Sequence, residues 1–175
     1  FVIATQNPIE YEGTYPLPEA QLDRFLMKLK VDYPSGEEET EMLRLHQQGF
    51  DPHTLALSDV RPVVDAALLA QARAELTAVT VEDGVLHYLV ALTAATRAAH
   101  QAMLGGSPRA SVALLRCSRV LAALEGRTFV TPDDVKTVAR PVLRHRLILR
   151  PEAEIEGYTT DQLVDSVLAA VPVPR

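Results

Sequence analysis

The sequence predicts a mainly α protein with two short strands near its N-terminus. After Tyr33, apolar residues recur at helical spacing in segments bounded by proline, glycine or capping residues. Before that point, the run from Phe1 to Ala4 is apolar on both faces, which is typical of a buried strand in a parallel sheet. From Phe25 to Val31 every second residue is apolar and Lys28 and Lys30 lie on the opposite face, which predicts a half-buried strand. We therefore expect the remnant of an α/β layer over residues 1–34 and an all-α domain over residues 35–175.

The first strand requires neighbours that this chain barely supplies. A strand that is apolar on both faces is stable only between other strands and beneath covering helices. We therefore expect it to pair with another chain or to be poorly ordered. Because the sequence opens with Phe1 inside an apolar run rather than with Met, we expect it to begin in the middle of a protein.

Helix boundaries are indicated by local capping signals. Ser35 and Glu38 have the spacing of a capping box, and Gly49 is a plausible end for the helix that they begin. Thr131 followed by Pro132 and two acidic residues predicts another strong helix start. The segment between Pro18 and Asp23 has room only for a short helix. Further helices are expected at about 64–78, 81–100, 107–125, 132–143 and 160–171.

One apolar stripe predicts that these helices share a core. It consists of Val81, Val85, Leu89, Leu92 and Thr96, which fall on one side of the 81–100 helix. The expected architecture of residues 35–175 is therefore a helical bundle.

Charge and cysteine content exclude several classes of protein. A formal net charge of -6 argues against a general binder of nucleic acid or of anionic membranes, because both need a basic surface. With Cys117 as its one cysteine, the chain cannot form an internal disulfide, so a cytoplasmic location is the default expectation. No apolar run is long enough to span a bilayer.

Two polar residues near the N-terminus could act on a phosphate. Asn7 follows the first predicted strand, at the carboxyl end where ligands of open α/β sheets bind, although Asn7-Pro8 could simply turn the chain. Arg24 lies at an element boundary, from which a long cation can project. The alternative for Arg24 is a surface ion pair with Asp23 or Glu19.

Arg109 is the candidate with the most direct physical argument. Ser107 and Pro108 have the pattern of an N-cap and a first helical residue, so Arg109 lies in the first turn of a helix, where the helix dipole disfavours a cation. An anion held jointly by the free N–H groups and the guanidinium would reverse that cost, and phosphate is a natural candidate. Arg109 and Arg116 should face away from the apolar side of this helix; a solvated Arg109 near a loop is the alternative. That apolar side consists of Leu114, Cys117, Leu121 and Leu124.

Other reactive residue types give no comparable signal. The five histidines lack zinc-binding spacing, and Cys117 on an apolar face is expected to be a packed thiol rather than a nucleophile. The acidic run from Glu37 to Glu41 is expected to complement a helix dipole rather than to bind a metal. The sequence also contains no G-x-x-x-x-G-K-S/T loop and no apolar strand that ends in paired acids. This chain alone is therefore not expected to hold a nucleoside triphosphate and its Mg²⁺.

Several segments resemble the signature of the MoxR family of AAA+ ATPases. They are Ala4-Thr5-Gln6-Asn7-Pro8-Ile9-Glu10, Glu12 to Phe25, Tyr33-Pro34-Ser35, Gly106-Ser107-Pro108-Arg109-Ala110-Ser111 and Val142-Leu143-Arg144-His145-Arg146. The resemblance covers nearly the whole chain and identifies it as the C-terminal portion of such a protein. It implies that residues 1–34 end the α/β nucleotide-binding core and that residues 35–175 form the helical lid.

The resemblance also implies roles for three residues. Asn7 matches sensor 1, which contacts the γ-phosphate and the attacking water. Arg24 matches the arginine finger, which reaches the nucleotide of a neighbouring protomer. Arg109 matches sensor 2 on the lid, which reports the state of the nucleotide. The implied cofactors are ATP and Mg²⁺.

For the whole protein, the resemblance implies ATP hydrolysis by a homo-oligomeric ring, expected to be a hexamer, with chaperone-like activity and von Willebrand factor A-domain proteins as partners. The missing nucleotide-binding loop predicts that this chain alone is inactive. Two alternatives are a non-catalytic helical interaction module and a helical domain that binds nucleic acid.

Overall fold

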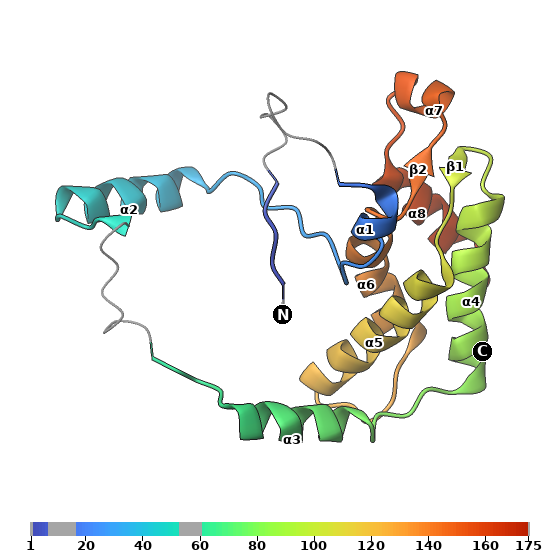
Figure 1. The fold of residues 1–175 in the computed structure, drawn as a ribbon, viewed down its shortest axis with the longest axis horizontal. Helices are drawn as coiled ribbons and strands as arrows, with labels where there is room; N and C mark the ends of the chain where they lie inside the picture. The colour runs from blue at the N-terminus through green and yellow to red at the C-terminus, as the bar shows by residue number, and fades with distance from the viewer. Residues whose placement is uncertain (1, 7–16, 53–60, 175) are drawn as a thin grey trace.

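The computed structural model describes residues 2–6, 17–52 and 61–174. Within these ranges the chain is mainly helical and contains one two-stranded antiparallel sheet (Figure 1), which confirms the predicted fold class. The helices are α1 (Glu19–Leu22), α2 (Gly36–Gln47), α3 (Ala66–Leu76), α4 (Asp83–Ala98), α5 (Pro108–Leu124), α6 (Pro132–Leu143), α7 (Pro151–Ile155) and α8 (Thr160–Ala170). The strands are β1 (Ala102–Leu104) and β2 (Ile148–Leu149), with Ala102 opposite Leu149.

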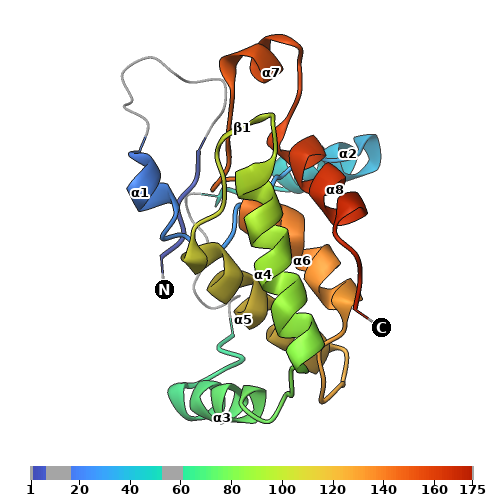
Figure 2. The ribbon, with the colours of Figure 1, turned by 90° about the vertical axis from the view of Figure 1, so that its right-hand side faces the viewer.

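Helices α4, α5, α6 and α8 form one bundle with a continuous apolar core (Figures 1 and 2). On α4 the predicted stripe is largely correct, because Val85, Leu89, Leu92 and Thr96 are buried and Val81 is partly buried. Among the residues that α6 and α8 bury are Val135, Val138, Val142, Leu163, Val164 and Val167. On α5 the apolar face is shorter than predicted, since Leu114 and Cys117 are buried whereas Leu124 is 80% exposed.

The helix starts follow the capping residues in the sequence. Ser35 and Glu38 form the predicted capping box at α2, and Thr131 caps α6 with Pro132 as its first residue. Ser107 caps α5, where its hydroxyl accepts a hydrogen bond from the backbone N–H of Arg109. These local signals explain why the predicted boundaries agree with the structure to within a few residues.

Helices α2 and α3 have no buried residues. Figure 1 shows α2 set apart from the bundle on an extended connection, and both views place α3 at the end of the bundle away from α7. Glu37, Glu38 and Glu39 lie in the first turn of α2, as predicted for a dipole complement. The hydrogen bonds from the backbone and hydroxyl of Ser35 lower the pKa of Glu38.

The two strands predicted near the N-terminus are not formed. Neither residues 2–4 nor residues 25–31 belong to a strand, and the sheet of the described region comes from the helical part of the chain. Phe25 and Met27 are half-buried as the alternation predicts, but Val31 is 93% exposed. Alternation produces a strand only where a partner strand is available. Here the segment packs on a helix end instead, because the N–H of Lys28 donates to the carbonyl of Pro141, 2.8 Å away.

None of the helices in the described part of the chain is both long enough and apolar enough to cross a membrane.

Candidate functional site

Arg24 lies on a tight turn directly after α1. The turn is closed by backbone hydrogen bonds from Arg24 to Gln21 (3.1 Å) and from Phe25 to Leu22 (3.0 Å). The Arg24 side chain is exposed, and in the described part of the chain its guanidinium has neither a hydrogen bond nor an ion pair. The expected alternative, a surface ion pair with Asp23 or Glu19, does not form, and Asp23 is instead engaged by other side chains.

Asp23 connects this turn to the first turn of α5. The Ser107 hydroxyl donates to Asp23 Oδ2 at 3.0 Å, and Arg109 Nη1 lies 3.9 Å from the same oxygen. The predicted cost of a cation at this helix start is therefore partly relieved by an internal carboxylate. The ion pair is long and the Arg109 side chain is 60% exposed, so most of its guanidinium remains available to another anion.

Arg146 is the buried member of this group. It follows α6 and is only 6% exposed, yet it carries a guanidinium. Its Nε donates to Asp23 Oδ1 at 3.1 Å, and its Nη1 and Nη2 donate to backbone carbonyls on the turn and to Val142. Burial lowers the pKa of Arg146, and the neighbouring carboxylate of Asp23 opposes that effect. We refer to Asp23, Ser107, Arg109 and Arg146 as the Asp23 clasp.

Contacts beyond the clasp also hold the segment that follows Arg24. The ring of His145 lies 3.0 Å from the carbonyl of Phe25 through Nε2, which donates when that nitrogen carries the proton. Burial lowers the pKa of His145, so the neutral ring is favoured. Further along, Lys30 Nζ and Arg144 Nε flank Asp161 at 2.6 and 3.0 Å. Burial alone would raise the pKa of Asp161, but these two cations lower it.

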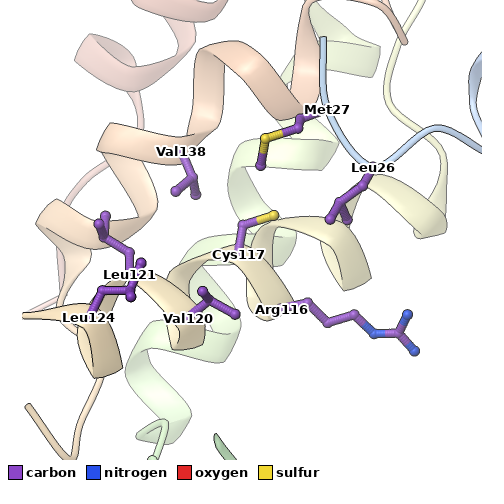
Figure 3. A pocket seen from close by; sticks show the side chains of 8 residues that line it. All are labelled: Leu26, Met27, Arg116, Cys117, Val120, Leu121, Leu124 and Val138. Atoms are coloured by element: carbon purple, nitrogen blue, oxygen red, sulfur yellow. The ribbon is translucent and has the colours of Figure 1, made fainter. Parts of the chain in front are cut away.

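An apolar hollow of about 260 Å³ lies beside the same segment (Figure 3). It is lined by Leu26, Met27, Arg116, Cys117, Val120, Leu121, Leu124 and Val138. Figure 3 shows Arg116 extending away from the hollow, in agreement with its predicted outward position on α5. Burial raises the pKa of the Cys117 thiol, and this favours the packed, unreactive form that was predicted.

The structure brings two of the three predicted residues to one place. Arg109 contacts Asp23, the residue directly before Arg24, whereas Asn7 lies outside the described residues. The residues that join them, Asp23 and Arg146, were missed as site residues, because a sequence does not show which charged side chains are buried. The signal in the sequence that could have pointed to Asp23 was its position directly before Arg24. In the described ranges, no group of three or more His, Cys, Asp or Glu residues could hold a metal ion.

Comparison with known proteins gives matches to the two segments of the chain that contain the clasp residues. Residues 94–167 match the model described as the AAA lid domain, and residues 1–27 match that of the ATPase family associated with various cellular activities (AAA). The chain is 37% identical to the chaperone MoxR1 of Mycobacterium tuberculosis and 32% identical to protein MoxR of Paracoccus denitrificans. Each alignment covers 99% of this chain. It covers 47% of the length of MoxR1 and 56% of the length of MoxR. The chain belongs to the MoxR family of AAA+ ATPases.

Two further comparisons agree with membership of the MoxR family. YeaC of Bacillus subtilis is 42% identical over 99% of this chain and 53% of its own length. A crystal structure of a Cytophaga hutchinsonii protein, provisionally called an ATPase, superposes with a TM-score of 0.85. It has 37% identity and covers 97% of this chain and 53% of that protein. The MoxR-family chain thus spans about half the length of the curated relatives it matches.

In this MoxR-family chain the clasp joins the two matched segments. Asp23 and Arg24 fall within the AAA match, whereas Ser107, Arg109 and Arg146 fall within the lid match. The hydrogen bonds of the clasp therefore attach the end of one matched segment to the other.

Proposed function

We propose that this chain is the C-terminal part of a longer MoxR-type AAA+ ATPase, here called the intact protein. That protein would couple ATP hydrolysis to chaperone-like remodelling or maturation of partner proteins. The division into a core remnant at 1–34 and a lid at 35–175 belongs to the same proposal. The observation that carries it is the place of Arg24: it is exposed, has no partner among the described residues, and lies on a turn that is attached to the start of α5 beside Arg109.

The available groups fit the phosphates of a nucleotide. Arg109 offers a mostly exposed guanidinium at a helix N-terminus, where N–H groups and the dipole favour an anion. Arg24 offers a guanidinium that has no partner in the described part of the chain and can form a bidentate contact with phosphate oxygens. ATP and Mg²⁺ would be held mainly by residues outside this chain, because its sequence contains no phosphate-binding loop.

Each residue then has one part in hydrolysis. Arg24 would stabilise the charge on the transferred phosphoryl group at the nucleotide of a neighbouring subunit, because a finger acts across a head-to-tail interface in a ring. Arg109 would contact the phosphate of its own subunit and change the position of the lid. Asn7 would orient the attacking water. The ring is proposed to be a hexamer, with von Willebrand factor A-domain proteins as partners and the cytoplasm as its location.

ATP turnover and client protection by the intact protein test this proposal. We expect phosphate release that is abolished when the lysine of its nucleotide-binding loop is replaced. We also expect ATP to reduce aggregation of a chemically denatured model protein, and a non-hydrolysable analogue to fail. Absence of turnover in assembled protein would favour a non-catalytic helical interaction module.

A further inference from the structure

Arg146 uses its whole hydrogen-bonding capacity on one turn and one helix end. A guanidinium has five N–H donors. Nε bonds Asp23 Oδ1, Nη1 bonds the carbonyls of Leu26 and Val142, and Nη2 bonds the carbonyls of Asp23 and Phe25. Four of these five acceptors belong to the turn from Asp23 to Leu26. Arg24 lies within that turn, and its side chain has no hydrogen bond or ion pair among the described residues.

Because Arg146 is buried, its N–H donors need partners within the protein. A guanidinium removed from water is tolerated only when its donors are satisfied, and a missing partner leaves an uncompensated buried charge. The five donors of Arg146 can all be satisfied only if the turn keeps its present conformation against α6. Arg146 therefore fixes the backbone on both sides of Arg24. His145 reinforces the same point through the carbonyl of Phe25.

The same carboxylate links this turn to the start of α5. Asp23 Oδ1 accepts from Arg146, while Oδ2 accepts from Ser107 and faces Arg109. If Arg109 turned toward a phosphate, Asp23 would keep its bonds to Ser107 and Arg146. The turn bearing Arg24 would then remain attached to α5 and α6 whichever anion Arg109 contacts.

We propose that Arg146 is a positioning residue for Arg24. It fixes the turn from Asp23 to Leu26 on the lid, so that Arg24 is presented in one orientation and moves with the first turn of α5. A change of lid position in one subunit is thereby carried to the arginine that serves the next subunit. This inference rests on the proposed function of Arg24 as a finger.

The test uses Arg146→Lys and Arg146→Met in the intact protein. Lys supplies a charge without the planar set of five donors. We expect both variants to bind ATP within a few-fold of wild type and to form rings, while kcat falls by about 10²-fold, as for a misplaced catalytic group. Arg140→Met is the matched control, because Arg140 lies near the end of α6, is exposed and, among the described residues, pairs with Asp165 rather than with the turn from Asp23 to Leu26. We expect that control to keep wild-type kcat.

Subunit mixing separates positioning from a general structural role. A variant defective in the nucleotide-binding loop should restore turnover to Arg146→Met, since it lends a well-placed Arg24 to an intact nucleotide site. Mixing Arg146→Met with Arg24→Ala should restore nothing, because both variants lack a working finger. If the loop-defective variant also fails to restore turnover, in rings shown to contain both subunits, then Arg146→Met damages its own nucleotide site. That result would overturn the inference.

Two outcomes distinguish this inference from the proposed function. If Arg24→Ala hydrolyses ATP normally, the proposed function fails. If Arg24→Ala is inactive while Arg146→Lys and Arg146→Met keep wild-type kcat, only the positioning role fails. Should Arg146→Met not assemble, Asp23→Asn carries the test. It keeps the backbone acceptors but removes the charged partner, and unchanged kcat in that variant would overturn the inference.

Discussion

Asp23 is the residue through which the predicted phosphate-binding arginines are connected. Its carboxylate has three partners, Ser107, Arg109 and Arg146, although its side chain remains 20% exposed. The bond to Arg146 is shielded from water, whereas the 3.9 Å contact with Arg109 is long and open to solvent. A solvated ion pair contributes little stability. Arg109 can therefore leave Asp23 at small cost, which is the behaviour required of a residue that responds to a nucleotide.

Replacing Arg109 tests that behaviour directly. In the intact protein, Arg109→Ala should uncouple ATP binding from lid position, because it removes the cation that we propose distinguishes triphosphate from diphosphate. Hydrolysis should fall even where rings still assemble. Turnover and a distance probe between lid and core, recorded with each nucleotide, would measure both effects. If both stay as in wild type, the sensor role of Arg109 is wrong.

A second residue-scale prediction concerns Asp134, which is buried at the start of α6. Arg127 Nη1 donates to Asp134 Oδ2 at 2.7 Å, and the backbone N–H and hydroxyl of Thr131 donate to the same oxygen. The hydrogen bond from Arg127 lowers the pKa of Asp134, with help from Thr131, although burial acts in the opposite direction. Asp134→Asn should therefore reduce the free energy of unfolding by roughly 1–3 kcal/mol at pH 7.

The pH dependence of that difference has a defined sign. Because the pKa of Asp134 is lower in the folded state, its stabilising contribution is complete above the unfolded value of about 4. It is lost as the pH falls through the folded pKa. The gap between wild type and Asp134→Asn should thus narrow below about pH 4 in urea unfolding. Asp133→Asn is the control, since Asp133 has an 85% exposed side chain. A gap that widened in acid would contradict the assignment.

At the scale of elements, the helices could be predicted because their signals are local. Ser35, Ser107 and Thr131 each cap the helix that the sequence indicated. The segment after Phe25 could not be predicted in the same way. Its alternation is real, but the groups that determine its conformation are Pro141 and Arg146, more than 100 positions away in the sequence. No local pattern contains that information.

The same contrast applies to the candidate site. The helix start at Arg109 could be predicted from the sequence, because the capping Ser107 and the unfavourable charge of Arg109 lie within three residues of each other. The clasp could not be predicted from the sequence, because it depends on the burial of Arg146, which only the packed structure shows.

The loop between β1 and α5 provides an element-scale prediction. A Cβ added at Gly105 would lie 2.5 Å from the Cα of Arg97 on α4, closer than such atoms can approach. The neighbouring Gly106 is held there by its N–H bond to Thr96 Oγ1 at 2.9 Å. Gly105→Ala should therefore shift the start of α5 and cost about 2 kcal/mol or more.

Urea unfolding of the chain measures that cost. Gly36→Ala is the matched control, because a Cβ at Gly36 meets nothing within 4 Å. We expect it to stay within about 0.5 kcal/mol of wild type. Equal unfolding midpoints for Gly105→Ala and wild type would show that the loop can move away from α4.

At the scale of the whole molecule, this chain carries groups that we propose respond to phosphate, but its sequence contains no phosphate-binding loop. Backbone N–H groups of such a loop normally supply much of the binding to a triphosphate. The 175-residue chain alone should therefore show no measurable ATPase activity and only weak nucleotide affinity. Calorimetric titration with ATP is the measurement. Micromolar affinity would contradict the expectation and reveal a nucleotide site within these residues.

The assembled protein is where Arg24 is expected to matter. Its guanidinium has no partner among the described residues, and its turn is anchored through Asp23 and Arg146. A finger acts only where one subunit meets the nucleotide of the next, and head-to-tail contacts of this kind close into rings. In the intact protein, Arg24→Ala should bind ATP within a few-fold of wild type but lose roughly 10³-fold or more in hydrolysis.

Mixing experiments decide whether Arg24 acts in trans. A subunit with a defective nucleotide-binding loop still carries Arg24, so it should restore part of the activity of Arg24→Ala by serving that subunit's intact nucleotide site. Arg24→Lys should rescue poorly, because an ammonium cannot reproduce the two-pronged contact of a guanidinium. Arg140→Ala, which removes an exposed arginine paired with Asp165, should behave as wild type in every mixture. Normal hydrolysis by Arg24→Ala, or no gain in rings that demonstrably contain both variants, would leave Arg24 as a solvated surface arginine.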